Sequence, residues 1–308
     1  MANKITKGDI KLISHIAEYN FLTVKQLSAL TQRMTQVVRR RLRRLENEKL
    51  IVIKERVFGK GRGRPEQIHI LTQKGKELLY DQEILSNHAT YITDKTTEFI
   101  FISHDLLVNW FFIHLLQIGR DIRQLTTQHL TTSSHNLIEG KTDSPLLQEH
   151  FTKDDASENT HTMVPDGVFT ITDKLSQKTL LFFLEVDMGT ETLVNTKRGP
   201  GDIRQKIINY QSIFRTCRYK RYKKAFQSEF NGFRLLFLTN SFGRMKAMCD
   251  LVVGMPPSDF IWLTDQERMF SKGISAGIWA RGGKYHKPSE SILGPKLGLD
   301  APFVNKIR

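Results

Sequence analysis

Residues 22–45 read LTVKQLSALTQRMTQVVRRRLRRL, and this stretch decides the fold of the first part of the chain. Thr23 and Gln26 have the Thr-x-x-Gln spacing of a capping box, which predicts a helix that starts directly after Thr23. Thr35 is the predicted N-cap of the next helix. Apolar residues at helical spacing face the core in that helix, namely Val38, Leu42 and Leu45. The rest of its circumference carries arginines that we expect to face solvent or phosphate: Arg39, Arg40, Arg41, Arg43 and Arg44.

The segments on either side of this stretch complete a small domain. Upstream, residues 9–19 have the one-sided apolar spacing of a helix. Downstream, residues 50–58 and 67–71 read as two strands, joined by the sequence GKGRGRPE, which predicts a mobile hairpin tip. Three helices followed by a basic hairpin resemble a winged helix-turn-helix, a DNA-binding fold, which we assign to residues 1–80.

The positive charge of the chain is concentrated in this domain. Residues 1–76 contain 18 Lys or Arg against 6 Asp or Glu, so they carry +12 of the net charge of +14. A basic domain joined to a nearly neutral one indicates phosphate contacts, and double-stranded DNA is the expected partner. The segment Arg62-Gly63-Arg64-Pro65 has the core of an AT-hook, whose arginines enter a narrow minor groove. The expected DNA contacts are Gln36, Arg39, Arg40, Arg43 and Arg44 in the helix and Lys60, Arg62 and Arg64 in the hairpin.

Length and composition exclude several classes of protein. With 308 residues and 39% hydrophobic content, the chain is long enough for two packed domains. It has no apolar run long enough to span a membrane, and its first residues lack the apolar segment of a secretory signal. Cys217 and Cys249 are the only cysteines, which argues against a disulfide framework and a zinc site. We therefore expect a cytoplasmic protein, associated with the nucleoid or with a plasmid, that does not bind a membrane.

Carboxylates lie at the ends of two strands predicted in the second half of the chain. Asp166 begins the strand DGVFTIT, while Glu185 and Asp187 end the strand TLLFFLEVD. Residues two apart on a strand project from the same face, so Glu185 and Asp187 are expected to point together. The short turn between the strands makes them antiparallel neighbours, which brings Asp166 beside that pair. Three converging carboxylates predict a site for Mg²⁺ or Mn²⁺.

This arrangement resembles a known nuclease fold. The PDG sequence, a short hairpin, an apolar strand ending in E-x-D and a helix with Gln205, Lys206 and Tyr210 are similar to the PD-(D/E)xK fold. With the N-terminal domain, the helix bearing HDLLVN and the EVDMGTE segment, residues 7–265 resemble the plasmid replication-relaxation family. The resemblance implies a role in controlling the replication or transfer of plasmids and other mobile elements.

The sequence departs from active nucleases of this fold at one position. Asp187 stands where those enzymes place a lysine that helps to position the attacking water. The resemblance then implies a catalytic set of Asp166, Glu185 and Asp187, with Lys206 or Lys197 in the role of the missing lysine. Otherwise the site is an inactive platform that needs no metal, in which Arg204 or Lys206 neutralises the paired carboxylates.

The fold class predicted from these patterns is α/β (α+β), with a winged helix-turn-helix followed by a PD-(D/E)xK restriction-endonuclease-like domain. The expected parts are residues 1–80 as the DNA-binding domain, 81–125 as connecting helices, 126–163 as a polar loop or partly disordered insertion, 164–280 as the nuclease-like domain and 281–308 as a Gly/Pro-rich tail.

A second basic cluster follows the helix that carries Lys206. It contains Arg215, Arg218, Lys220, Arg221, Lys223 and Lys224, interleaved with Tyr219 and Tyr222. Nucleic-acid surfaces combine charge and aromatic rings in this way, whereas a solvated helix face is the alternative. We expect Arg218, Lys220 and Arg221 to contact DNA.

Two functions remain open at this point. In the first, the protein is a DNA-binding regulator of a plasmid or related element, and its second domain serves assembly or contacts with other proteins of the replication or transfer machinery. In the second, the same DNA-binding domain delivers a Mg²⁺-dependent endonuclease that uses Asp166, Glu185 and Asp187. A homodimer is compatible with either function.

Overall fold

The chain forms two compact units. The computed structural model describes residues 5–55, 67–85, 102–131, 146–152, 160–194, 202–286 and 290–294. Among these, residues up to Ile113 belong to the first unit, and residues from His114 onward belong to the second. Helix α5 (Ile102–Asp121) therefore begins in one unit and ends in the other. No helix in the described stretches is long and apolar enough to cross a membrane.

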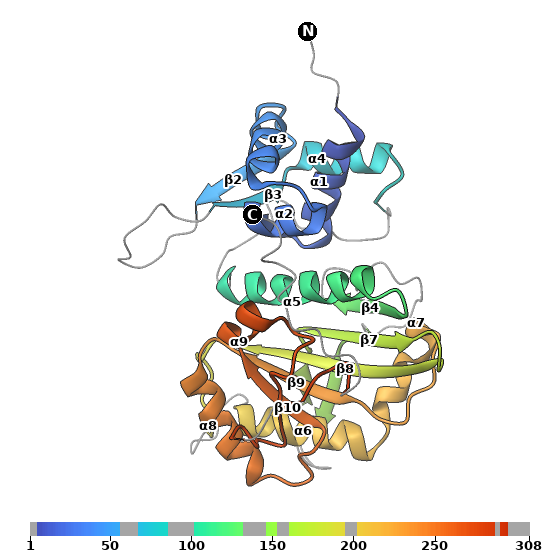
Figure 1. The fold of residues 1–308 in the computed structure, drawn as a ribbon, viewed down its shortest axis with the longest axis vertical. Helices are drawn as coiled ribbons and strands as arrows, with labels where there is room; N and C mark the ends of the chain where they lie inside the picture. The colour runs from blue at the N-terminus through green and yellow to red at the C-terminus, as the bar shows by residue number, and fades with distance from the viewer. Residues whose placement is uncertain are drawn as a thin grey trace. The chain divides into compact units, whose positions relative to one another are not determined.

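The first unit combines helices with a small antiparallel sheet (Figure 1). Its helices are α1 (Lys7–Glu18), α2 (Val24–Thr31), α3 (Thr35–Asn47) and α4 (Gln73–Asp81). Its strands are β1 (Phe21–Thr23), β2 (Ile51–Glu55) and β3 (Gln67–Leu71), paired in the order β1-β3-β2. The segment between β2 and β3, with the expected DNA contacts Lys60, Arg62 and Arg64, lies outside the described residues.

The helix starts of the first unit test the capping predictions. The capping box of α2 is confirmed, because Gln26 N–H donates to Thr23 Oγ1 at 3.2 Å and Thr23 N–H donates to Gln26 Oε1 at 3.0 Å. The N-cap predicted for α3 is wrong by one residue. Met34 is the N-cap, since its carbonyl accepts from the N–H groups of Val37 and Val38, and Thr35 is already helical. The apolar stripe of α3, Val38, Leu42 and Leu45, is buried as predicted.

The second unit is built around a mixed six-stranded sheet in the order β11-β10-β9-β8-β7-β4. Strands β8 (Lys178–Asp187), β9 (Arg234–Thr239) and β10 (Ile261–Asp265) are parallel, whereas β4 (Leu125–Thr131), β7 (Gly167–Asp173) and β11 (Ala280–Arg281) pair antiparallel. A separate hairpin joins β5 (Glu149–Thr152) to β6 (Thr160–Met163). With helices and a sheet in both units, the chain is of the α+β class, as predicted.

Helices cover the sheet of the second unit and fix its core. Helices α6 (Ile203–Arg215), η2 (Arg218–Tyr222), α7 (Lys223–Phe226) and α8 (Phe242–Val253) share one core cluster with β7 to β10 (Figure 1). Phe183 of β8 lies at its centre, with ring centroids 5.5 Å from Tyr210, 5.4 Å from Tyr222 and 4.7 Å from Phe233. Elsewhere in this unit, the ring of His114 on α5 packs against the ring of Phe270 on α9 (Gln266–Lys272), with 6.4 Å between the ring centroids.

The polar segment 126–163 corrects one prediction. It is not a loop at its two ends, because β4 pairs with β7 from Leu125 opposite Asp173 to Thr131 opposite Gly167, and the β5–β6 hairpin follows. An edge strand has one free side, so polar residues are tolerated along it and the apolar alternation that reveals a strand is weak. The Gly/Pro-rich tail likewise begins as structure, since Glu290 pairs through its backbone with Trp279.

Candidate functional site

The hairpin of β7 and β8 brings two of the predicted carboxylates together. Gly167 pairs with Leu184, so Asp166, the residue before β7, lies level with Glu185. Asp166 Oδ2 accepts a hydrogen bond from the backbone N–H of Val186 at 2.6 Å. The antiparallel register predicted from the short turn therefore places Asp166 beside Glu185.

Glu185 is held by two side chains from one face of α6. Its side chain is buried, and Lys206 Nζ lies 3.0 Å from Glu185 Oε2 while the hydroxyl of Tyr210 donates to Oε1. Lys206 and Tyr210 are four residues apart, which puts them on the same side of a helix. Asp202 caps this helix by accepting from Gln205 N–H at 2.7 Å, which fixes where the first turn begins. Of the two basic partners proposed from the sequence, the structure selects Lys206, while Arg204 is exposed.

The protonation of this group follows from burial and charge. Burial raises the pKa of Glu185 to about 7, against Lys206 and the hydrogen bond from Tyr210, which lower it; the nearby Asp166 adds to the rise. Burial lowers the pKa of Lys206, but the charges of Glu185, Glu191 and Asp166 outweigh it and raise that pKa above its ordinary value. Lys206 therefore stays a cation over the whole range in which Glu185 titrates.

Asp187 has a different partner from Glu185. Arg244 of α8 forms an ion pair with it, with Arg244 Nη2 3.2 Å from Asp187 Oδ1 in addition to a shorter contact from Nε to Oδ2. The same Nη2 donates to the backbone carbonyl of Glu191 at 2.5 Å. Glu185 and Asp187 are therefore bound by side chains of two different helices, α6 and α8.

Arg244 and its neighbour Asn240 hold the segment that follows β8. Asn240 Nδ2 donates to the carbonyl of Met188 at 2.6 Å, and Gly189 N–H donates to Asp187 Oδ1 at 3.1 Å. Gly189 has a φ of +77°, in the left-handed region that favours glycine. These contacts give the sequence EVDMGTE one defined path from the strand end to Glu191.

The donor set does not fit the predicted three-carboxylate metal site. In the part of the chain that the structure describes, no three Asp, Glu, His or Cys side chains gather as ligands of one ion. Asp166 and Glu185 have the oxygen chemistry that Mg²⁺ prefers, but Lys206 and Tyr210 bind both oxygens of Glu185, and Arg244 binds Asp187. The group is thus a buried ion pair with one further carboxylate beside it.

The arginines of α3 divide into two sets. Gln36, Arg39, Arg40 and Arg43 are exposed. Arg41 and Arg44 instead turn toward Asp9 of α1, at 2.9 Å and 3.7 Å from its carboxylate oxygens. Asp9 is fully buried and also closes a capping box with Thr6. Two of the five arginines, including the predicted DNA contact Arg44, thus bind a carboxylate of the same domain while staying partly exposed.

The second basic cluster contains both buried rings and exposed or paired cations. Tyr219 and Tyr222 are buried in the core of the second unit, so they are not the exposed stacking rings expected from the interleaved sequence. Arg218 and Lys220 are exposed, and the Arg218 guanidinium lies 5.5 Å from the centre of the Phe151 ring. Arg221 Nη1 donates to Glu149 Oε1 at 2.8 Å.

Comparison with known proteins gives the family. A family model described as replication-relaxation matches residues 13–228, more than half of the chain. The chain belongs to the replication-relaxation family. Neither curated proteins nor solved structures gave a match. Membership confirms the resemblance found in the sequence and suggests a role in the replication or transfer of plasmids or other mobile elements.

Three site residues of this replication-relaxation protein were not singled out in the sequence. Arg244 lies 57 positions from Asp187, and Asp9 lies 32 positions from Arg41, so no local spacing links them. Glu191 was visible only as the last letter of EVDMGTE, although its carboxylate lies 3.4 Å from Lys206 Nζ. Each of these residues acts through a partner from a distant element, which only the folded chain reveals.

Proposed function

We propose that this protein is a DNA-binding regulator of a plasmid or other mobile element and that it controls replication or transfer of that element. In this proposal the first unit is a winged helix-turn-helix domain, α3 is its recognition helix and double-stranded DNA is its partner. The second unit is a PD-(D/E)xK-like domain in which the Glu185–Lys206 pair has a structural role.

The exposed face of α3 is the observation that carries the proposal. Arg39 and Arg40 lie three and four residues after Gln36, and Arg43 lies four and three residues after them. The four side chains therefore share one side of the helix, opposite the buried stripe. Arginine and glutamine are the side chains that form paired hydrogen bonds with guanine and adenine in the major groove. Few acidic residues oppose them, because the domain as a whole is strongly basic.

The contacts of Asp9 supply the rigidity that such a helix needs. Through Arg41 and Arg44, the buried carboxylate ties the side of α3 to the first turn of α1. A side chain that reads bases has to be held in place by its neighbours, since small displacements break paired hydrogen bonds. The two anchored arginines thus support the three exposed ones.

The test is a variant with Arg39→Ala, Arg40→Ala and Arg43→Ala together. We expect its affinity for a mixed-sequence DNA duplex to fall at least about tenfold, and the slope of log Kd against log salt to decrease by up to about 3, because each of these cations that also neutralises a phosphate contributes about one unit. The matched control replaces the exposed Lys246, Lys272 and Lys284 of the second unit by alanine, with the same change in charge. If both variants bind alike, α3 is not the DNA-binding helix.

DNA cleavage is a second candidate function, favoured by the proximity of Asp166, Glu185 and Lys206. Lys206 is a permanent cation at this site and is able to hold a phosphate oxygen if it leaves Glu185. The expected result under the regulator proposal is that supercoiled DNA incubated with Mg²⁺, Mn²⁺ or EDTA is bound but not nicked. Metal-dependent nicking that is lost in both Asp166→Ala and Glu185→Ala would establish the nuclease instead, and nicking that persists in both variants would indicate a contaminant.

A further inference from the structure

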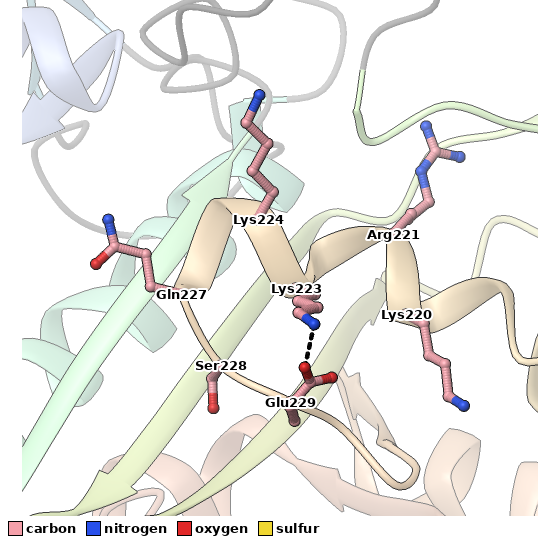
Figure 2. Close-up of a pocket in the computed structure, with 7 residues that line it drawn as sticks. All are labelled: Lys220, Arg221, Lys223, Lys224, Gln227, Ser228 and Glu229. Carbon is pink, nitrogen blue, oxygen red and sulfur yellow. Dashed lines mark ion pairs between the residues drawn. The ribbon is translucent and has the colours of Figure 1, made fainter.

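The outer surface of η2, α7 and the turn that follows forms a hollow of about 720 Å³, shown in Figure 2. The residues that line it are Lys220, Arg221, Lys223, Lys224, Gln227, Ser228 and Glu229. We call it the basic hollow. All of its lining side chains are polar, and four of them are cations against one carboxylate. The excess of cations favours an anion with several hydrogen-bond acceptors as the ligand of this surface.

The cations of the basic hollow differ in what already binds them. Arg221 is held by Glu149 and by the carbonyl of Gln148, at 2.8 Å and 3.0 Å. Lys223 forms an ion pair with Glu229. Lys220 and Lys224 are exposed, and neither has an ion pair with a residue in the described ranges. Two lysines are thus available at once, and a third becomes available when Glu229 is displaced or neutralised.

The directions of these side chains favour an extended ligand. In Figure 2, Lys220 and Lys223 extend to the side of the helical segment on which Glu229 lies, whereas Lys224 and Arg221 extend to the other side. A single small anion cannot contact cations on both sides of the segment. A chain of phosphates that crosses it can, because each repeat of the chain presents another charge.

The inner side of the same segment holds the basic hollow in a fixed place. Tyr222 is fully buried, and its ring lies 5.4 Å from the ring of Phe183 on β8. Phe183 also contacts Tyr210, the hydroxyl of which donates to Glu185. The packed aromatic rings fix the backbone that carries the lysines, so only the lysine side chains lose conformational freedom when a ligand binds.

We propose that the basic hollow binds the phosphodiester backbone of DNA, as a second contact that is separate from α3. This inference rests on the proposed function only in that the ligand is the same DNA. Backbone contacts hold the duplex without reading its sequence. The second unit would thereby bind DNA of any sequence.

The experiment measures the affinity of a mixed-sequence duplex for three variants of the full chain, each of which loses three positive charges. They are the α3 variant described above, a variant of the basic hollow and the control variant. We expect Lys220→Ala with Lys223→Ala and Lys224→Ala to weaken binding about fivefold to tenfold and to lower the salt slope by about 2 to 3. The control with Lys246, Lys272 and Lys284 replaced should match the wild type. Thermal unfolding of each variant verifies that the fold is intact, and a hollow variant that binds like the control would overturn the proposal.

A single substitution that removes a negative charge, and is expected to tighten binding, provides a second test. Glu229→Gln removes the one carboxylate of the basic hollow and releases Lys223, so it should tighten duplex binding about twofold to fivefold. Unchanged or weaker binding by Glu229→Gln would count against the proposal. Pyrophosphate serves as a small-anion probe: pyrophosphate binding that depends on the hollow lysines, without any effect of those lysines on duplex binding, would also overturn it.

The same assay separates this inference from the proposed function. Loss of binding in the α3 variant alone would keep α3 as the DNA-binding helix and reject the basic hollow. Loss in the hollow variant alone would keep the basic hollow and reject α3. Loss in both variants supports both contacts, and their double variant should then bind more weakly than either.

Discussion

Replacement of Lys206 by methionine should lower the free energy of unfolding by about 3 kcal/mol at pH 8 and by much less at pH 5. The variant removes the cation that lies 3.0 Å from the buried carboxylate of Glu185. Loss of one partner of a buried ion pair leaves the other charge without compensation, and methionine keeps most of the packing volume of the lysine stem. Because Lys206 is partly exposed, we expect the lower end of the usual range of about 3 to 5 kcal/mol.

The pH dependence follows from the sign of the pKa shift. Glu185 has a folded-state pKa of about 7, above its ordinary value of 4.5, so the folded state holds the proton more tightly than the unfolded state. The contribution of this group to stability is complete below pH 4.5 and is lost as the pH rises through 7. Without Lys206 the carboxylate is still harder to ionise, so the loss at high pH becomes larger while the variant at pH 5 keeps a neutral Glu185.

Urea denaturation of the two proteins at both pH values measures this effect. The double variant Lys206→Met with Glu185→Gln should recover much of the loss at pH 8, because it contains no unpaired charge. Lys272→Met, at an exposed position of α9, is the matched control and should have almost no effect. An equal loss at pH 5 and pH 8 would show that the lysine stabilises the fold by packing and not by its charge.

Replacement of Asp9 by alanine should lower the free energy of unfolding by about 2 to 3 kcal/mol, which is the second large effect that we expect. Part of it comes from the capping box of α1, where an N-terminal cap contributes about 1 kcal/mol. The rest comes from Arg41 and Arg44, which lose the buried carboxylate that holds them. Because α3 loses its anchor on α1, the same variant should also bind DNA more weakly under the proposed function.

The effect of Asp9 should disappear in acid. Burial raises the pKa of Asp9, but hydrogen bonds from Thr6 and Arg41 outweigh it and hold that pKa below its ordinary value. A lowered folded-state pKa gives stability that is present above the unfolded-state value and is lost as the pH falls through the folded-state value. The free energies of unfolding of Asp9→Ala and of the exposed control Asp81→Ala should therefore differ at pH 7 and converge only as the pH falls below 3.8 toward the lowered folded-state pKa of Asp9. A difference that persists in acid would contradict the ion pair as its source.

The sequence predicted the elements whose signals are local. The capping box of Thr23 and Gln26, the apolar stripe of α3 and the β7–β8 hairpin all depend on spacings of a few residues, and the structure has each of them. The edge strand β4 was not predicted, because its sequence lacks apolar alternation and the strand is recognised only by its pairing with β7. Buried polar pairs were not predicted either, because their members lie far apart in the sequence. The partner of Asp187, for example, lies on a helix 57 positions away.

The partners of Glu185 and Asp187 show what strand alternation does and does not predict. Alternation assigns two residues to one face of a sheet, but it does not say which helices cover that face. Here α6 and α8 share the same core cluster, and each supplies the cation for one of the two carboxylates. The acidic residues of the group around Glu185 were thus visible in the sequence, whereas the partner of Asp187 follows only from the positions of both helices. The catalytic assignment of these residues stays a prediction.

The position of Lys206 and Tyr210 on α6 limits where insertions and deletions can accumulate in this chain. Both side chains reach Glu185 from a helix whose start is fixed by Asp202. The backbone carbonyls of Thr192 and Leu193 accept hydrogen bonds from Ile203 N–H and Arg204 N–H, each at 3.1 Å, so the first turn of the helix is also held by residues that precede Asp202. One residue inserted between Asp202 and Lys206 would rotate the rest of the helix by about 100°, which would turn lysine and tyrosine away from the carboxylate together. Related chains that keep this ion pair should therefore be constant in length from Asp202 to Tyr210.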